Sequence, residues 1–315
     1  MRIACFNVEN MFSRYRFLDE PWSEKKYEQY ISPSGLATIA SRQGDILPEA
    51  TTHEQRKSTA SAILECQPDV LSVCEVENLQ TLRIFNAQYL RHYFDRIISI
   101  DGNDPRGIDV GLLVKRGFSG TVENIRTHVD LAAEPNEFVN RGAAFYARGN
   151  LFSRDCLNVL LKNAGREYSI FVNHFKAQDG KSSSTDKRLR QAREVSDLVN
   201  NEPINRKVIV LGDLNIDTRQ RDYDNSLDPL VNNSRLAEPW EAEAPAQRWT
   251  HYYESEDSVS KLDYIFVEQS LNIVDKGIVR AGLAEDCHYT SDPRFPTVQG
   301  YGTEASDHCP VWIEV

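Results

Sequence analysis

The amino-acid sequence predicts an α+β fold in which two packed β-sheets are covered by helices. Short apolar runs typical of buried strands recur along the whole chain of 315 residues, and helix patterns with one apolar face lie between some of them. No internal repeat, low-complexity tract or clean linker interrupts this pattern. We therefore expect one domain that spans residues 1–315.

Helix signals fall at three places. The segment Thr52–Gln55 has the pattern of a capping box, which predicts a helix that ends before Pro68. The spacing of apolar residues from Leu79 to Tyr89 predicts a second helix, and a third is expected over about 185–199. Residues 13–48 lack periodicity and are interpreted as a surface insertion. The expected strands cover residues 3–6, 70–74, 94–100, 108–115, 142–147, 156–162, 168–174, 208–211, 262–267, 273–279 and 310–315.

The expected strand Val208–Leu211 is followed by two polar residues that suit chemistry. Gly212 closes the apolar run, and Asp213 and Asn215 stand two positions apart, so that an extended backbone points both side chains to one face. The carboxylate can hold a divalent cation or polarise water, and the neutral amide can donate to an oxyanion. Taken alone, the same residues would form an ordinary turn.

Other expected strands also lead to polar residues, and this recurrence favours a functional interpretation of the turn. Six strand-like segments each provide a side chain suited to phosphate or metal chemistry. Besides Asp213 and Asn215, these side chains belong to Asn7, Glu75, Asn173-His174, Asp263 and Ser306-Asp307-His308.

This ordered set resembles the endonuclease/exonuclease/phosphatase superfamily, which shares the fold of pancreatic-type DNase. Within that superfamily, the segments Asn7–Phe12 and Arg106–Leu113 resemble a branch of predicted bacterial nucleases. The resemblance runs from Arg2 to Val315. It implies a four-layer α/β/β/α sandwich of two mixed β-sheets flanked by helices.

The resemblance also implies a metal site. Glu75 corresponds to the metal-binding glutamate of the family, Asp307 to an acid kept near the metal, and Asn7 to an asparagine that supports the site. Mg²⁺ is the expected ion because it takes one or two carboxylates and completes its shell with water and phosphate. Mn²⁺ or Ca²⁺ are expected substitutes, and Glu77 is a lesser candidate ligand.

The expected catalytic groups follow from the same resemblance. His308 and Asp263 correspond to a base and the acid that orients it, an arrangement that fixes the imidazole tautomer. His174 and Asn215 correspond to donors to the phosphate. Either His308 or Asp213 takes the proton from water, and the number of metal ions stays open.

Three further residues are candidates for substrate binding or positioning. Asp109 is expected to orient His174 from a neighbouring strand. Arg141 stands where the family often places an arginine on the substrate phosphate, although a surface salt bridge is the alternative. The most basic stretch of the chain is either a nucleic-acid rim or a solvated helix face, and it contains Lys176, Lys181, Lys187, Arg188, Arg190 and Arg193.

We interpret the sequence as a Mg²⁺-dependent nuclease, most simply an endonuclease, which hydrolyses DNA or RNA by metal-assisted in-line attack of water. The net charge of −11 opposes non-specific binding to a polyanion, so any such binding needs a local basic rim. The charge slightly favours the alternative, a phosphatase or phosphodiesterase that acts on a small or lipid phosphoester. The third hypothesis is a catalytically dead binding scaffold.

Composition limits the remaining choices. No run approaches the roughly 18 apolar residues of a membrane span, so no membrane association is expected, and no obligate protein partner is inferred. The six cysteines have no C-x-x-C spacing and are expected to be buried and reduced, although a Cys287–Cys309 bridge stays open. An apolar strand follows the N-terminus at once, so the expected location is cytoplasmic by default, with export of a trimmed precursor as the alternative.

Overall fold

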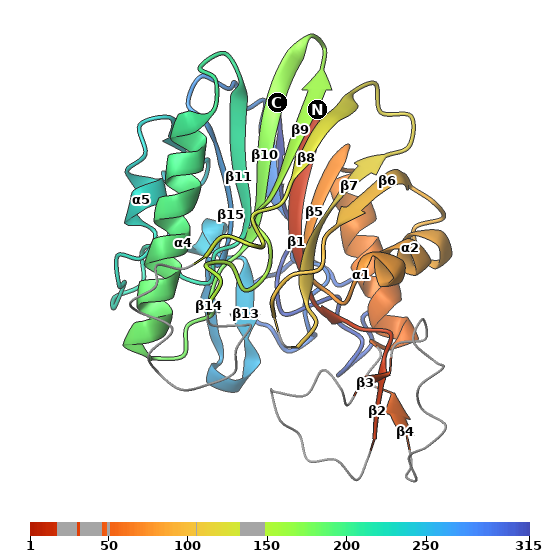
Figure 1. The fold of residues 1–315 in the computed structure, drawn as a ribbon. Coiled ribbons are helices and arrows are strands. Elements are labelled where there is room, and N and C mark those ends of the chain that lie inside the picture. Colours follow the sequence, from red (N-terminus) through yellow and green to blue (C-terminus); the bar gives the residue numbers. More distant parts are fainter. Residues whose placement is uncertain (18–29, 32–45, 49–50, 105, 133–148) are drawn as a thin grey trace.

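The computed structural model describes residues 1–17, 30–31, 46–48, 51–104, 106–132 and 149–315. These residues form two six-stranded β-sheets that pack face to face, with helices on both outer faces (Figure 1). The predicted α/β/β/α sandwich is therefore confirmed. The expected strand 142–147 and Arg141 lie outside the described residues.

The first sheet has the strand order β16-β17-β1-β5-β7-β6. It is mixed, because β1 runs parallel to β5 while the remaining neighbours are antiparallel. Its strands are β1 (Arg2–Met11), β5 (Val70–Val76), β6 (Phe94–Ser99), β7 (Asp109–Lys115), β16 (Asp275–Ile278) and β17 (Val311–Glu314).

The second sheet has the order β12-β15-β11-β10-β9-β8, and among its described strands β10 and β11 form the one parallel pair. The edge strand β8 was not expected from the sequence, since all but one of its residues are exposed and it lacks the apolar run of a buried strand. The strands are β8 (Thr121–Arg126), β9 (Leu157–Asn163), β10 (Arg166–His174), β11 (Lys207–Asp213), β12 (Leu236–Ala237) and β15 (Asp263–Glu268).

Strand alternation divides the apolar side chains of the two large sheets between one core that lies between the sheets and one core under the helices on each outer side. In β11, Ile209 and Leu211 face the other sheet, whereas Val208 and Val210 face the helices. Helices α1 (His53–Cys66) and α2 (Leu79–Gln88) cover the first sheet, and α4 (Ser182–Asn201) with the short α5 (Asp228–Val231) covers the second.

The predicted start of α1 is confirmed in detail. Thr52 is the N-cap, its side chain accepts from the backbone N–H of Gln55, and the Gln55 side chain accepts from the backbone N–H of Thr52. At the other end Gln67 adopts a left-handed conformation with φ 48°, directly before Pro68. Both ends of this helix were therefore readable from local sequence.

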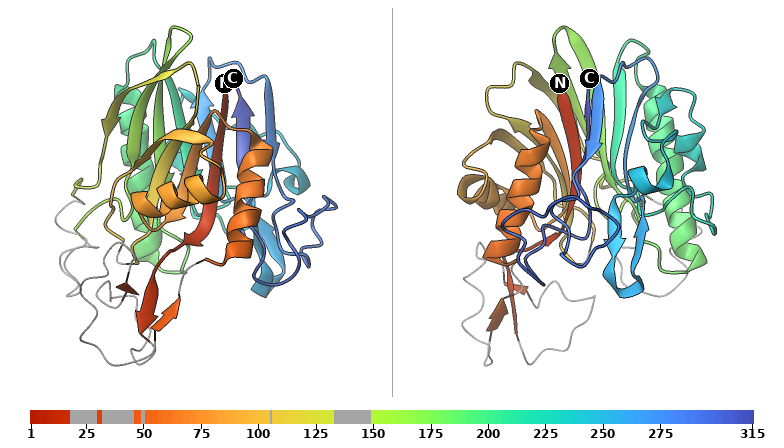
Figure 2. Two further views of the ribbon diagram at one scale, coloured as in Figure 1. Left: turned by 90° about the vertical axis from the view of Figure 1, so that its right-hand side faces the viewer. Right: turned by 180° about the vertical axis from the view of Figure 1, so that it is seen from behind.

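Smaller elements lie around the strand ends that are far from both termini. Figure 2 shows the N- and C-termini side by side, and the N-terminal ammonium group donates to the Val315 carbonyl over 2.7 Å. Strands β2 (Tyr15–Phe17), β3 (Tyr30–Ile31) and β4 (Ile46–Pro48) form a three-stranded sheet within the expected insertion. The remaining elements are α6 (Pro245–Arg248), β13 (His251–Tyr253), the 3₁₀ helix η4 (Glu254–Glu256) and β14 (Ser258–Ser260).

Within the described residues, the longest helices are too polar or too short to cross a lipid bilayer. The six cysteines are all buried and free. The expectation of buried thiols is confirmed, and no Cys287–Cys309 bridge is formed.

Candidate active site

The two parallel strand pairs bring the predicted side chains to one end of the sandwich. Asn7 of β1 is paired with Cys74, next to Glu75, and His174 of β10 is paired with Asp213 of β11. Antiparallel pairing then places Asp263, the first residue of β15, opposite Asp213. The carboxyl ends of parallel strands meet at the same sheet edge, which explains why residues so distant in sequence come together.

The backbone at this end is irregular in a way that re-aims side chains. The register between β1 and β5 shifts after Asn7, and the register between β5 and β7 shifts around Glu75. Glu9, Asn10, Glu75 and Asn215 all have positive φ values, between 48° and 64°. Such conformations are uncommon for residues with a Cβ and cluster at functional sites. The bulge at Glu75 leaves its carboxylate 3.7 Å from His174 Nε2, and Asn7, the last regularly paired residue before the shift in β1, contacts Asp213.

Gly212 is required where β10 and β11 approach. Its φ of 140° is unfavourable for residues with a side chain, and a Cβ there would lie 1.8 Å from the carbonyl oxygen of Asn173. The glycine before Asp213 therefore serves the close strand approach that positions the carboxylate beside His174.

Asp213 is the centre of the polar network. Its Oδ2 accepts from Asn7 Nδ2 at 2.9 Å and from Asn215 Nδ2 at 3.1 Å, while Oδ1 accepts from the Asn215 backbone N–H at 2.9 Å. The Nε2 atoms of His174 and His308 lie 3.5 and 3.9 Å from the same Oδ2. Burial raises the pKa of Asp213 to about 7, partly countered by His308.

His308 and Asp263 lie in direct contact. The Nδ1 atom of His308 is 2.8 Å from Asp263 Oδ2, which also accepts from the Thr250 hydroxyl at 2.8 Å. Burial by itself disfavours the charged imidazole, but Asp263, Asp307 and Asp213 together raise the His308 pKa well above its usual value. The contact fixes the tautomer, with Nδ1–H toward Asp263 and Nε2 toward the site.

His174 has a different environment. Its Nε2 lies 3.7 Å from Glu75 Oε1, and its buried Nδ1 has no hydrogen-bond partner. Burial, followed by the positive charges of Arg154 and Arg106, holds its pKa well below the usual value. The expected orienting contact from Asp109 is wrong. Asp109 Oδ1 accepts instead from the backbone N–H of Gly102 at 2.7 Å, because the turn before β7 folds back onto this carboxylate.

The oxygen donors of the site fit a hard divalent cation. Among the described residues, only histidines form ion pairs with Glu75, Asp213 and Asp307. Burial and then Asp307 raise the pKa of the neighbouring Glu9 to about 8. Carboxylates clustered in this way with no lysine or arginine partner have the chemistry of an Mg²⁺ or Ca²⁺ site. The structure does not show Glu75, Asp307 and Asn7 around one common point, so this ligand set stays a prediction.

The basic stretch is only partly a surface rim. Arg188 is 1% exposed and pairs with Asp224, and Lys187 is 8% exposed and donates to Ser153 Oγ. Neither a nucleic-acid rim nor a solvated helix face is therefore correct for Lys187 and Arg188, because both side chains are buried and anchor α4. Lys176 lies at the rim, 3.6 Å from Asp179. Glu77 is also structural, since it accepts from the backbone N–H of Ser13 at 2.6 Å.

A pocket of about 230 Å³ opens beside Asp307. Its lining combines carboxylates with two tyrosine rings, which gives it an acidic and partly aromatic character. The carboxylates belong to Glu9, Glu254, Glu304 and Asp307, and the rings to Tyr252 and Tyr253.

Three residues near His308 were not selected as site residues from the sequence. Glu9 accepts from the Asp307 N–H, Thr250 holds Asp263, and His251 Nε2 lies 3.4 Å from Asp307 Oδ2. Glu9 is part of the Asn7–Phe12 segment and could have been found there. Thr250 precedes and His251 begins the short strand β13, which has no recognisable sequence pattern, so no local signal marked them.

The fold and the acid–histidine cluster define the class of phosphoester hydrolases with a DNase-like sandwich. A sequence profile of the Endonuclease/Exonuclease/phosphatase family matches residues 2–248, and the chain belongs to this family. The family is metal-dependent and its members are phosphoester hydrolases.

The chain is similar to several characterised proteins. Sphingomyelinase C of Leptospira interrogans is 29% identical over 161 residues, which cover 49% of this chain and only 28% of that protein. TDP2 of D. rerio in complex with a single-strand DNA product has a TM-score of 0.61 and 14% identity, covering 99% and 97% of the two chains. A mannosyl-6-phosphatase of Bacteroides thetaiotaomicron VPI-5482 has a TM-score of 0.59 and 14% identity over 100% and 98%. At such identities the two structures show a common fold alone.

Proposed function

We propose that this protein is a divalent-metal-dependent phosphodiesterase that hydrolyses nucleic acid, most simply as an endonuclease. The observation that carries the proposal is the buried cluster of His308, Asp263 and Asp213. It provides a tautomer-fixed imidazole and a carboxylate at one strand end, beside oxygen ligands suited to Mg²⁺.

Asp213 and His308 have complementary roles in this proposal. Asp213 is held by Asn7 and Asn215, and a pKa of about 7 suits a group that takes a proton from the attacking water. His308, whose pKa is raised, donates a hydrogen bond from Nε2 to a phosphoryl oxygen. Glu75 with Asn7 or Asp307 would hold the metal ion, which when bound neutralises the phosphate and the leaving oxygen.

Asn215 positions Asp213 in this proposal and does not contact the phosphate directly. Both hydrogens of its amide have acceptors, since Nδ2 donates to Asp213 Oδ2 at 3.1 Å and to the Phe175 carbonyl at 3.2 Å. His174 keeps its imidazole neutral and faces the site through Nε2. A neutral imidazole there can donate to the substrate or to Glu75.

The test is nicking of supercoiled plasmid with Mg²⁺ and with EDTA. His308→Ala should lower the rate by at least about 100-fold, the usual loss when a hydrogen-bond donor to a developing oxyanion is removed. The matched control is His288→Ala, because His288 is an exposed histidine on a loop with a 64% accessible side chain. Undiminished Mg²⁺-dependent nicking by His308→Ala would remove its proposed role.

A second candidate is hydrolysis of a small phosphoester that carries a cationic group. The acidic pocket beside Asp307 favours it, because four carboxylates and two tyrosine rings suit a quaternary ammonium better than a polyanion. The similarity of the chain to a sphingomyelinase C supports the same candidate function. The two candidate functions are separated by assaying three small substrates beside the plasmid. These are a phosphocholine ester, mannose 6-phosphate and bis-(p-nitrophenyl) phosphate. Phosphocholine release without plasmid nicking would replace the nuclease proposal.

A further inference from the structure

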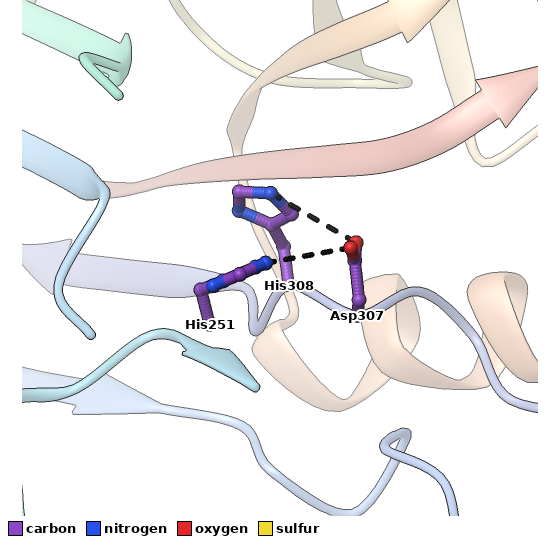
Figure 3. Close-up of side chains that lie close together, drawn as sticks. All are labelled: His251, Asp307 and His308. Atoms are coloured by element: carbon purple, nitrogen blue, oxygen red, sulfur yellow. Dashed lines mark ion pairs between the residues drawn. The ribbon is translucent and has the colours of Figure 1, made fainter. Parts of the chain in front are cut away.

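We propose that His251, Asp307 and His308 form a second cation site, which takes a transition-metal ion of the zinc class. Figure 3 shows both imidazole rings directed at the Asp307 carboxylate. His251 Nε2 lies 3.4 Å from Oδ2, and His308 Nε2 lies 3.9 Å from Oδ1. All three ligand atoms lie within 4.8 Å of one another.

The backbone preorganises the two histidines. His251 and His308 are partners in an antiparallel bridge, flanked by hydrogen bonds from the Tyr252 N–H to the Asp307 carbonyl at 2.9 Å and from the Cys309 N–H to the Thr250 carbonyl at 2.6 Å. Bonds in these flanking positions make the histidines a non-hydrogen-bonded pair, whose side chains are close and on one face. Their ring centroids are 4.7 Å apart.

Each imidazole also has a partner on its other nitrogen. His308 Nδ1 contacts Asp263 Oδ2 at 2.8 Å, and His251 Nδ1 contacts Ser260 Oγ at 3.2 Å. Histidines that bind metals through Nε2 regularly have their Nδ1–H held by a carboxylate or another acceptor, which fixes the tautomer and the ring. Both Nε2 atoms thus face Asp307, and an ion bound there would displace the proton that His308 Nε2 otherwise carries.

The donor set distinguishes this site from the expected Mg²⁺ site. Two imidazole nitrogens and one carboxylate suit Zn²⁺ and its neighbours, whereas the Glu75 side offers oxygen ligands that suit Mg²⁺. Three protein ligands leave a position for water or a fourth ligand. The side chains of His251 and Asp307 are 13% and 40% accessible, so an ion can enter from solvent.

Occupation of this site should inhibit the enzyme. A zinc ion on His308 Nε2 removes the imidazole from the phosphate, and it also takes Asp307 from the expected Mg²⁺ ligands. The expected inhibition rests on the proposed function, whereas zinc binding itself does not.

The experiment measures zinc directly, without substrate. Metal-free protein is titrated with Zn²⁺ by calorimetry and by equilibrium dialysis with metal analysis, and Co²⁺ reports nitrogen ligation by its visible absorption. His251→Phe should lose one equivalent of tightly bound zinc or bind it at least about 10-fold more weakly. Loss of a residue that only hydrogen-bonds to a metal ligand already lowers metal affinity by about 10–100-fold. His288→Phe, on the exposed loop, is the matched control and should keep the equivalent.

Zinc inhibition is then measured relative to the zinc-free rate of each variant. His251→Phe should need at least about 10-fold more Zn²⁺ than the wild type for the same fractional inhibition. Unchanged zinc binding by His251→Phe would overturn the site, whatever the hydrolytic activity. If His251→Phe does not fold by circular dichroism, His251→Asn serves in its place. Zinc binding that depends on His251 in a protein with no hydrolytic activity would support the site and overturn only the proposed function.

Discussion

Asp213→Asn should abolish hydrolysis and at the same time stabilise the fold. The carboxylate is 1% exposed, and burial raises its pKa from 3.8 to about 7. At 1.36 kcal/mol per pKa unit, this rise corresponds to about 4 kcal/mol of destabilisation when the group is ionised. An amide oxygen in the place of Oδ2 still accepts from Asn7 and Asn215 Nδ2, but the amide NH₂ then faces the Asn215 backbone N–H, and this lost bond offsets about 2 kcal/mol. The net gain should be about 2 kcal/mol.

The sign follows from proton counts. Between about pH 4 and 7 the folded state holds a proton on Asp213 that the unfolded state has released, so the stability contributed by this group falls as pH rises. Above about pH 7 the full cost is present, and below about pH 4 both states are protonated. The advantage of Asp213→Asn should therefore grow from pH 4 to pH 7 and then stay constant.

Urea denaturation in EDTA, followed by circular dichroism from pH 4 to 9, measures this difference. Saturating Mg²⁺ should narrow it, because a cation near the site stabilises the ionised carboxylate of the wild type. Asn215→Ala is the comparison that perturbs the same network but keeps the carboxylate. A variant that is destabilised equally at every pH would refute the reasoning.

Three further predictions concern other parts of the network. Asp263→Asn should lower kcat by about 10²–10⁴ with little change in KM, measured by plasmid nicking, because it disturbs the His308 tautomer. Gly212→Ala should fail to fold or lose several kcal/mol in a thermal melt, because its Cβ would overlap the Asn173 carbonyl. Lys187→Met should stabilise the fold by about 2 kcal/mol below pH 8, since the fall of the Lys187 pKa from 10.5 to about 8 corresponds to about 3 kcal/mol and the lost hydrogen bond to Ser153 offsets about 1 kcal/mol. That gain should shrink above pH 8, where the folded state has already released the proton, and a pH-independent effect would contradict it.

The fold was predictable because strand and helix signals agree with each other along most of the chain. The run Val208–Leu211 became the central strand β11, and the Thr52–Gln55 pattern became the N-terminus of α1. The pairing of His308 with Asp263, which rested on the family resemblance, is a 2.8 Å contact. Polar residues that directly follow a recognisable strand were the easiest to select from the sequence.

The features that were missed depend on tertiary context. The left-handed backbone at Glu75 arises from a bulge, which no propensity of glutamate predicts. Lys187 and Arg188 look like a solvated helix face, but they are buried because α4 packs on loops that offer Ser153 and Asp224. His251 became part of the site only through its bridge to His308.

The charge distribution explains how an acidic protein can act on a phosphoester. Several arginines are committed to internal ion pairs, such as Arg188 with Asp224 and Arg235 with Glu268. In the proposed function the phosphate is therefore held mainly by a metal ion, with His308 beside it, and Lys176 is one rim cation that can add to this. Each phosphate neutralised by the protein contributes a slope of roughly −0.7 to −0.9 to the dependence of log K on log salt. Binding through the metal alone neutralises few phosphates, so this enzyme should show a shallow salt dependence that a basic nuclease would not.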